Sequence, residues 1–387
     1  MQMSGRPETL NQLVELLNAK EFEIPRNQDK STDDFPTYLE NELNAYQEYY
    51  ESSLKPRLDD LFPSDAAVAD KISILSDGLI IAVRLYYKGK LPDAADSFRK
   101  ALEEVGFADL SATQVVEAGR NFYRTRASSD RQLVRKDLFH NPFQNRGIVA
   151  TSRYSIPGLP ALYLGDSTYV CWEEFNRKPI RELYFSRFCS AENLNVIKIQ
   201  RLPDFIEQLK EVKGDFSTAL TMFMRYLSLF PLSIACSIRT KSNTDTFKPE
   251  YIIPQLLLQF VLSLELESED DIIHGIMFPS TKVDYNKIQN VPAYNFIFPV
   301  RKDESTGYCS DLVRQFALTA PTSIELHMLT NFSSISPLTL EEGMEHVGLT
   351  KYVTILDNEK SSYATTAFGT LERILRQLQP AQLENAC

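Results

Sequence analysis

Apolar residues recur every three or four positions through the first third of the chain, and this spacing predicts helices. The pattern is clear in LNQLVELL, FPTYLENELNAYQEYY and VADKISILSDGLIIAVRLYY, and strand signals are few before Arg126. The stretch AVRLYYKGKLPDAADSFRKALEEV predicts two helices joined by a Gly-Lys-Leu-Pro turn, with alanines of the second helix facing the first. We expect a single helical hairpin, because one such repeat cannot bury both its faces as a solenoid does.

The pattern changes after Arg135 to short β-like runs separated by a few helices. The runs are GIVATSRYS, PALYLG, RELYF, NVIKI, LSIACSIR, DIIHGIMF and AYNFIFPV. From about Pro337 two amphipathic helices are predicted, TLEEGMEHVG and YATTAFGTLERILRQLQ. We therefore expect an α+β fold in three parts. These are an all-α accessory domain over 1–130, an α+β domain over 131–335, and a helical extension over 336–387 that packs on the second part.

Composition sets limits on the partners of the chain. Its 387 residues exceed the usual size of one hydrophobic core, which agrees with more than one domain. The net charge of −11, without a long Lys/Arg run, opposes a nonspecific hold on nucleic acid or anionic lipid, so we expect neither as a partner. No apolar signal core opens the sequence, and polar residues or prolines interrupt its most apolar stretches. The sequence therefore predicts a soluble, cytoplasmic protein.

Cysteine and histidine spacing gives no sign of a metal site. The five cysteines are scattered and never spaced as CxxC, and the four histidines form neither HxxxH nor HExxH. Structural zinc sites and many zinc enzymes use such spacings to place two ligands together. We expect reduced thiols and no bound metal.

The common nucleotide-binding and hydrolase motifs GxGxxG, GxxxxGK[ST] and GxSxG do not occur. One block is instead unusually rich in anion-binding, ring-stacking and acidic side chains: DLFHNPFQNRGIVATSRYSIPGLPALYLGDSTYVCWEEF. Such a composition is unusual for a segment that only packs. The block therefore holds the candidate chemistry of the chain.

The ordered motifs of this block, FHxPF, RYSxPGxPxLYLG and CWEE, resemble the longer bacterial members of the RES domain family. The resemblance extends from about Tyr123 through FKPEYIIPQLLLQF and GIMFPST to Asn295 in NFIFP. Members of that family degrade NAD, many are toxins paired with an antitoxin, and their fold is related to that of ADP-ribosyltransferases. The resemblance implies NAD as the substrate and an ADP-ribosyltransferase-like split β-sheet in the catalytic domain.

Four positions match the residues of the family: Arg153, Tyr163, Glu174 and Ser280. The resemblance implies that Glu174 stabilises the positive charge that grows on the ribose as nicotinamide leaves. Tyr163 would stack on the nicotinamide ring, and the Arg153 guanidinium would hold the pyrophosphate. Ser280 would contact a ribose or orient Glu174.

Four further residues of the family-like region are candidates to contact NAD: Tyr154, Arg146, His140 and Asn295. The choice between Glu173 and Glu174 is open on helical phase, because a helix capped at Ser167 projects both side chains near Val170. The spacing from Tyr163 favours Glu174.

The resemblance leaves several functions open. The acceptor of ADP-ribose is water in an NAD glycohydrolase, inorganic phosphate in an NAD phosphorylase, and a protein or nucleic acid in an ADP-ribosyltransferase. A noncatalytic helical scaffold with a degenerate RES-like domain is a further alternative, which the intact quartet disfavours. The expected role is that of a growth-arresting toxin or defence effector. For the N-terminal helices, binding of an antitoxin or regulatory protein, homo-oligomer formation and an internal lid all remain open.

Overall fold

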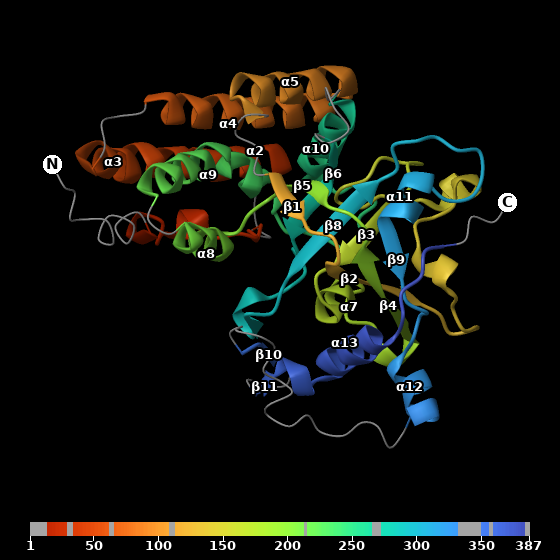
Figure 1. Cartoon of the computed structure of the whole chain (residues 1–387). Coiled ribbons are helices and arrows are strands. Elements are labelled where there is room, and N and C mark those ends of the chain that lie inside the picture. The colour runs from red at the N-terminus through yellow and green to blue at the C-terminus, as the bar shows by residue number, and fades with distance from the viewer. Residues whose placement is uncertain are drawn as a thin grey trace. The chain divides into compact units, whose positions relative to one another are not determined.

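The computed structural model describes residues 14–28, 34–61, 66–107, 113–212, 215–264, 272–331, 350–355 and 359–383. The chain is a mixed α/β protein that divides into two compact units, each assembled from separate segments (Figure 1). Unit 1 comprises Met1–Ala112, Ser152–Ile156 and Lys198–Leu264. Unit 2 comprises Thr113–Thr151, Pro157–Ile197 and Glu265–Cys387.

Unit 1 consists of helices. They are η1 (Lys20–Phe22), α2 (Phe35–Tyr49), η2 (Tyr50–Leu54), α3 (Lys55–Leu61), α4 (Ala66–Tyr87), α5 (Leu91–Glu104), α8 (Leu202–Glu211), α9 (Phe216–Cys236), η6 (Pro249–Tyr251) and α10 (Ile252–Ser263). An aromatic cluster joins α2 to α9, where the ring of Tyr46 lies 5.1 Å from Phe230 and 5.7 Å from Phe22. The buried Tyr46 hydroxyl donates to the Leu227 carbonyl oxygen at 2.8 Å, so the large ring leaves no polar atom unsatisfied.

The helical hairpin predicted from the sequence is confirmed by α4 and α5. Gly89 in the turn has a φ of 74°, a left-handed conformation that glycine adopts without strain. Gly78 lets the two helices approach closely, because a Cβ there would lie only 2.2 Å from the Cβ of Ala101. The small residues in the pattern therefore mark the contact line of the hairpin.

Helix α9 is long and apolar enough to cross a membrane, and 72% of its most apolar window is buried inside the protein. Within unit 1 it packs against α2 and α4. An apolar helix covered by other helices is the central helix of a globular unit, and this accounts for its composition without a bilayer.

Unit 2 is built on an eight-stranded sheet with the order β1-β5-β6-β8-β3-β2-β4-β9. The strands are β1 (Thr113–Val116), β2 (Asn121–Ala127), β3 (Ala161–Gly165), β4 (Leu183–Ser190), β5 (Leu194–Lys198), β6 (Ile273–Pro279), β8 (Tyr294–Pro299) and β9 (Phe316–Leu318). Strand β2 pairs with β4 along its whole length, but it meets β3 only where Tyr123 opposes Gly165. The sheet therefore splits between β2 and β3.

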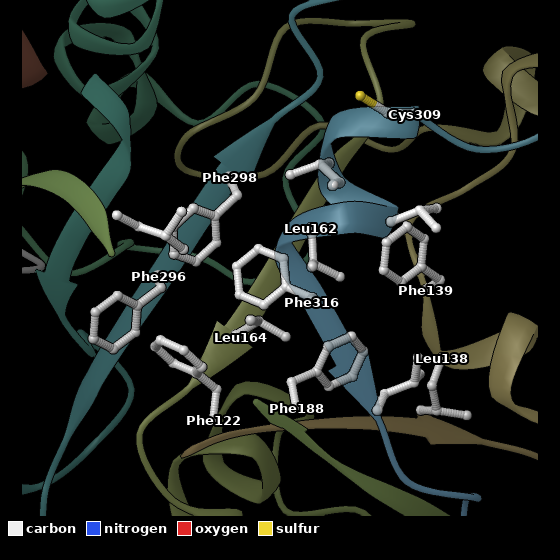
Figure 2. Close-up of a cluster of buried hydrophobic side chains, with 14 of the residues drawn as sticks. Phe122, Leu138, Phe139, Leu162, Leu164, Phe188, Phe296, Phe298, Cys309 and Phe316 are labelled. Carbon is white, nitrogen blue, oxygen red and sulfur yellow. The ribbon is translucent and has the colours of Figure 1, made fainter. Parts of the chain in front are cut away.

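One face of this sheet carries a phenylalanine-rich core (Figure 2). The Phe122 ring packs edge-on against Phe296, Phe298 and Phe316, with ring centroids 4.9 to 6.1 Å apart. The rings of Phe298 and Phe316 are tilted, with centroids 4.9 Å apart. The segments that cover this face are η3 (Arg135–Leu138), η4 (Phe143–Ile148) and α11 (Ser310–Gln315). Since side chains alternate along a strand, the neighbouring residues of β2, β3 and β8 lie on the opposite face.

That opposite face carries α7 (Thr168–Glu174) and α13 (Ala367–Gln377). Cys171 of α7 and Leu371 of α13 share an apolar cluster with Phe185 and Leu183 of β4 and with Tyr123 of β2. The remaining elements of unit 2 are η5 (Ile180–Glu182), η8 (Tyr285–Lys287), β7 (Ile288–Gln289), α12 (Ile324–Asn331), β10 (Tyr352–Thr354), β11 (Lys360–Ser362) and η10 (Tyr363–Thr365). A small sheet is formed by β11, β10 and β7. The predicted helix in YATTAFGTLERILRQLQ is α13, whereas TLEEGMEHVG lies outside the described residues.

The units do not follow the expected boundaries at residues 130 and 335. Strand β2 precedes residue 130 and yet lies inside the sheet, and the segment Lys198–Leu264 contributes helices to unit 1. The first five residues of the predicted strand LSIACSIR are the end of α9, which continues to Cys236, and GIVATSRYS forms no strand. The reason is that short apolar runs suit a buried helix as well as a strand, and the apolar face of α4 needs a helix that comes later in the chain.

Candidate active site

Glu174 is the last residue of α7, a helix with clear start and stop signals. The Ser167 hydroxyl caps its beginning by accepting the Val170 backbone N–H at 3.2 Å. After the helix, Asn176 and Arg177 adopt φ values of 53° and 56°, and this left-handed backbone turns the chain away. A carboxylate at the negative end of a helix dipole does not stabilise that helix, so the position of Glu174 calls for another explanation.

The Glu174 carboxylate is held by two buried donors from other parts of unit 2. Its Oε1 accepts the Ser280 hydroxyl at 2.6 Å and the Asn295 side-chain amide at 2.6 Å. Ser280 is 0% exposed and Asn295 is 6% exposed, whereas Glu174 is half-buried. No described residue donates a hydrogen bond to the second oxygen, Oε2. We call these three residues the carboxylate triad.

Sheet pairing brings the two donors together. Asn295 on β8 pairs with Phe278 on β6, and Ser280 follows the end of β6. The Ser280 N–H donates to the Ala293 carbonyl oxygen at 2.9 Å, and the Ser280 hydroxyl oxygen accepts the Lys282 N–H at 3.2 Å. Because an ionised carboxylate only accepts hydrogen bonds, the Ser280 hydroxyl is the donor in its bond to Glu174.

Tyr163 lies on β3, on the same face of the sheet as Asn295. Gly165 pairs with Asn295 and Tyr163 pairs with Ile297, so the two side chains are neighbours across the pair of strands. The Tyr163 side chain is half-buried. The same face carries α7, and the structure therefore places Tyr163 on the same side of the sheet as the triad.

Arg124 on β2 is a candidate that the sequence analysis did not identify. One guanidinium nitrogen, Nη1, donates to the Tyr163 carbonyl oxygen at 2.6 Å, and the buried Nε–H has no partner among the described residues. Burial, followed by the nearby Arg126 charge, lowers the pKa of Arg124 to about 9, so the group is still protonated at neutral pH. No ion pair joins it to a carboxylate in the part of the chain that the structure describes. A buried cation without a partner of opposite charge is suited to bind an anion.

Arg124 and Glu174 both influence the thiol of Cys171. The pKa of this thiol is raised, first by burial and then by the Glu174 carboxylate, while the Arg124 guanidinium acts in the opposite direction. Strand alternation places the Arg124 Cβ on the same face as Phe122, so its guanidinium reaches the Tyr163 carbonyl oxygen at the split of the sheet, and the triad lies on the opposite face. The same strand, NFYRTRA, also carries the polar residues Asn121, Thr125 and Arg126, so its sequence does not single out Arg124.

The structure separates the neighbouring carboxylates that helical phase could not distinguish. Glu173 is 3% exposed and forms a two-pronged ion pair with Arg177, with Nε–Oε2 at 2.8 Å and Nη2–Oε1 at 3.0 Å. Burial and a hydrogen bond to Glu173 raise the pKa of Tyr169. The contacts of Glu173 thus stabilise the end of α7, and Glu174 alone reaches Ser280 and Asn295.

Arg153 and Tyr154 both lie in unit 1. The Arg153 guanidinium donates to the carbonyl oxygens of Ile238 at 2.8 Å, Cys236 at 3.3 Å and Glu250 at 3.4 Å. These bonds tie the Ser152–Ile156 segment to the end of α9 and give Arg153 a structural task within unit 1. Tyr154 is fully buried. The expectation that these two residues contact NAD stays a prediction.

His140 and Arg146 also have structural partners. His140 Nε2 accepts the Cys309 N–H at 3.0 Å, and its Nδ1 donates to the Asn141 carbonyl oxygen at 2.8 Å. Burial lowers the pKa of His140 to about 4, so the ring is neutral. Arg146 forms an ion pair with Asp303, and its guanidinium lies 5.0 Å from the Phe143 ring centroid. None of these contacts links either residue to the triad.

Two comparisons with known proteins give no match: no family model matches the chain, and no solved structure does. The chain is similar to a protein of Bacillus subtilis (strain 168) named "Putative toxin YopC". The two are 33% identical over 303 residues, which cover 76% of this chain and 66% of the relative. The chain thus spans just under two thirds of the length of that relative.

We predict that Glu173→Gln lowers the free energy of unfolding by about 1–2 kcal/mol, because it breaks an ion pair whose carboxylate is buried and whose arginine is partly solvated. Urea unfolding followed by circular dichroism measures this change. Glu174→Gln is the matched control and is expected to cost less, since a glutamine oxygen still accepts from Ser280 and Asn295. A larger loss for Glu174→Gln than for Glu173→Gln would contradict the assignment of Glu173 as the stabilising residue.

Proposed function

We propose that unit 2 is an NAD-consuming enzyme that cleaves the bond between nicotinamide and ribose. The observation that carries this proposal is the carboxylate triad: one Glu174 oxygen is fixed by two buried donors, and no described residue donates to the other. Such a carboxylate is oriented before the substrate binds. A preorganised charge stabilises a transition state without the cost of reorienting the group during the reaction.

The proposed chemistry needs a fixed negative charge and no general acid at the leaving group. Positive charge develops on the ribose as the glycosidic bond breaks, and nicotinamide departs as a neutral base. The open Oε2 of Glu174 would face the ribose, while Ser280 and Asn295 keep the carboxylate in place. Tyr163, half-buried on the same face of the sheet, would stack on the nicotinamide ring.

Arg124 supplies what the negatively charged pyrophosphate of NAD requires. Its protonated guanidinium lies where β2 and β3 separate and bonds to the carbonyl group of Tyr163. A guanidinium in such a position binds phosphate oxygens through several parallel donors. The division of the sheet at this place also supports the proposed relation to the split sheet of ADP-ribosyltransferases.

We further propose that the chain acts as a growth-arresting toxin or defence effector in the bacterial cytoplasm. The name of the Bacillus subtilis relative supports a toxin role. Loss of NAD would stop growth, because energy metabolism depends on this dinucleotide. An antitoxin or other regulatory protein would bind the N-terminal helices and restrain the activity.

Water or inorganic phosphate is the acceptor in the main proposal. An ADP-ribosyltransferase that modifies a protein or nucleic acid is the alternative, because the same carboxylate, ring-stacking tyrosine and pyrophosphate-binding arginine would serve either reaction. A noncatalytic scaffold is less consistent with the triad, since a degenerate site has no reason to retain two buried donors directed at one carboxylate.

The first prediction tests the reaction itself. Purified protein incubated with NAD is expected to release nicotinamide, and mass spectrometry of the products with and without phosphate identifies the acceptor. Glu174→Gln is expected to lower turnover by roughly 10² or more, the scale for loss of a preorganised electrostatic group. Glu173→Gln is the comparison and is expected to lower turnover less, because it loosens the end of α7 but leaves the Glu174 charge in place. If the wild-type protein leaves NAD intact under all these conditions, the proposal is wrong. If labelled NAD leaves its label on a protein or nucleic acid, the result favours the ADP-ribosyltransferase.

The second prediction compares Arg124 with Arg153. Each is changed to Met, which preserves length and removes the charge, and NAD binding is measured by calorimetry on a Glu174→Gln background to prevent turnover. Arg124→Met is expected to weaken binding by about 10-fold or more, the loss of a charge-assisted hydrogen bond to phosphate. Arg153→Met is expected mainly to lower thermal stability, because its donors serve backbone carbonyls. The reverse result would return the pyrophosphate site to Arg153.

The third prediction concerns the cell. Induced expression of the wild-type chain in bacteria is expected to lower cellular NAD and arrest growth, whereas Glu174→Gln at the same soluble level does neither. Normal growth with depleted NAD would contradict the toxin role and leave the reaction standing. Arrest of growth by both proteins would show that toxicity does not come from the triad.

A further inference from the structure

We propose that the buried Glu372 of α13 is a positioning residue, through which the C-terminal segment, residues 350–355 and 359–383, holds α7 and with it the Glu174 carboxylate. The effect on turnover rests on the proposed function, whereas the effect on α7 does not. Glu372 makes no contact with the triad itself, so it acts through the helix.

Glu372 is tied to the first residue of α7. Its Oε1 accepts the Thr168 backbone N–H at 2.9 Å and lies 3.3 Å from the Thr168 hydroxyl oxygen. The Tyr363 hydroxyl donates to the same oxygen at 2.6 Å. Amide groups at the start of a helix lack partners within the helix, and a carboxylate there also faces the positive end of the helix dipole. Glu372 therefore anchors the beginning of the helix whose last residue is Glu174.

The shortness of α7 transmits this anchor to the active site. A helix of seven residues is roughly 10 Å long and moves as a rigid body. A displacement of Thr168 therefore produces a displacement of Glu174 of about the same size. The two hydrogen bonds of 2.6 Å from Ser280 and Asn295 tolerate little displacement. Orientation of the carboxylate thus depends on both ends of α7.

The same C-terminal segment also contacts the connection between the two donors of the triad. Strand β10 pairs with β7, with Val353 opposite Ile288 and Tyr352 opposite Gln289. Residues of the segment share an apolar cluster with this connection and with α7: Val353, Tyr363 and Phe368 pack with Val283, Val291, Ala293, Tyr169 and Val170. The segment therefore fixes Glu174 and its donors relative to one another.

The burial of Glu372 argues for a specific geometric task. It is 8% exposed, and an apolar residue of similar size would pack there without desolvating a carboxyl group. Burial raises the pKa of Glu372, and the bonds from Tyr363 and Thr168 act against this shift. The carboxyl group is buried with its partners arranged around it, as expected where the geometry of a hydrogen bond matters more than packing.

The sequence contains a built-in reporter of the position of α7. Trp172 is the single tryptophan of the chain and lies on this helix. Its indole N–H donates to the Lys178 carbonyl oxygen at 2.8 Å, and its ring lies 5.2 Å from the Phe368 ring of α13. Intrinsic fluorescence therefore reports the contact between α7 and α13 without any substrate.

The experiment uses the full chain and four variants. Glu372→Leu removes the acceptor, Glu372→Gln keeps an acceptor oxygen, and Tyr363→Phe removes one donor while its ring stays in the core. Ile374→Ala is the matched control, because it removes a buried apolar side chain on the same helix, two residues from Glu372, outside the apolar cluster that contains Cys171 and packs against Trp172. Each variant is measured for thermal unfolding, Trp172 emission and its quenching by acrylamide, and kcat and KM for NAD.

Glu372→Leu is expected to shift the Trp172 emission, increase its quenching and lower kcat by roughly 10-fold to 10²-fold, the range for a displaced catalytic group. KM is expected to stay within about two-fold, because no contact with NAD is lost. Glu372→Gln is expected to recover most of the turnover, and Tyr363→Phe to change both readouts partially in the same direction. Ile374→Ala is expected to lower the melting temperature and leave emission and kcat unchanged.

If Glu372→Leu has the same Trp172 emission and the same kcat as the wild type, the proposal is wrong. Equal changes in Ile374→Ala would overturn it as well, since they would come from general loss of stability. If Glu372→Leu does not fold, Tyr363→Phe decides, and wild-type emission and kcat in that variant count against the proposal. Wild-type protein without NAD cleavage removes the proposed function, while the fluorescence comparison still decides whether Glu372 positions α7.

Discussion

The structure of the candidate site depends on one carboxylate oxygen, Oε1 of Glu174, and its hydrogen bonds to Ser280 and Asn295. Each of the three residues comes from a different element, so the interaction exists only when helix α7 and the β6 and β8 strands are all in place. Two donors of charge-assisted hydrogen bonds restrict the carboxylate more than one would. The fold of unit 2 therefore brings together three side chains from distant parts of the sequence.

The split of the sheet determines where other groups can lie. Strands β2 and β3 pair at only one position. The Tyr163 carbonyl oxygen of β3 therefore accepts a hydrogen bond from the Arg124 side chain of β2. The helices of unit 1 interrupt the same chain between β5 and β6. Contacts that define the site therefore come from segments separated by more than 100 residues, as for Glu174 and its two donors.

Local features were predictable from the sequence, and long-range ones were not. The α4–α5 hairpin and helix α13 follow from apolar spacing, small residues and turn signals, all of which act over a few positions. The resemblance to the RES family named Glu174, Ser280 and Asn295, which the structure places in contact. It did not show that Arg153 bonds to carbonyl groups of unit 1, because this depends on α9, a helix far along the chain. Arg124 was missed for a related reason: an arginine in a short strand gives no local sign of burial.

Departures from local rules gather around the candidate site. Glu174 stands at the helix end where a carboxylate is least favourable, and Arg124 carries a buried Nε–H without a partner among the described residues. The chain after α7 passes through two left-handed residues that are not glycine. Each feature costs stability, and packing elsewhere in unit 2 must offset it. Since natural sequences tolerate such conflicts mainly where function requires them, the conflicts at Glu174, Asn176 and Arg177 support a chemical role for this end of α7 independently of the family resemblance.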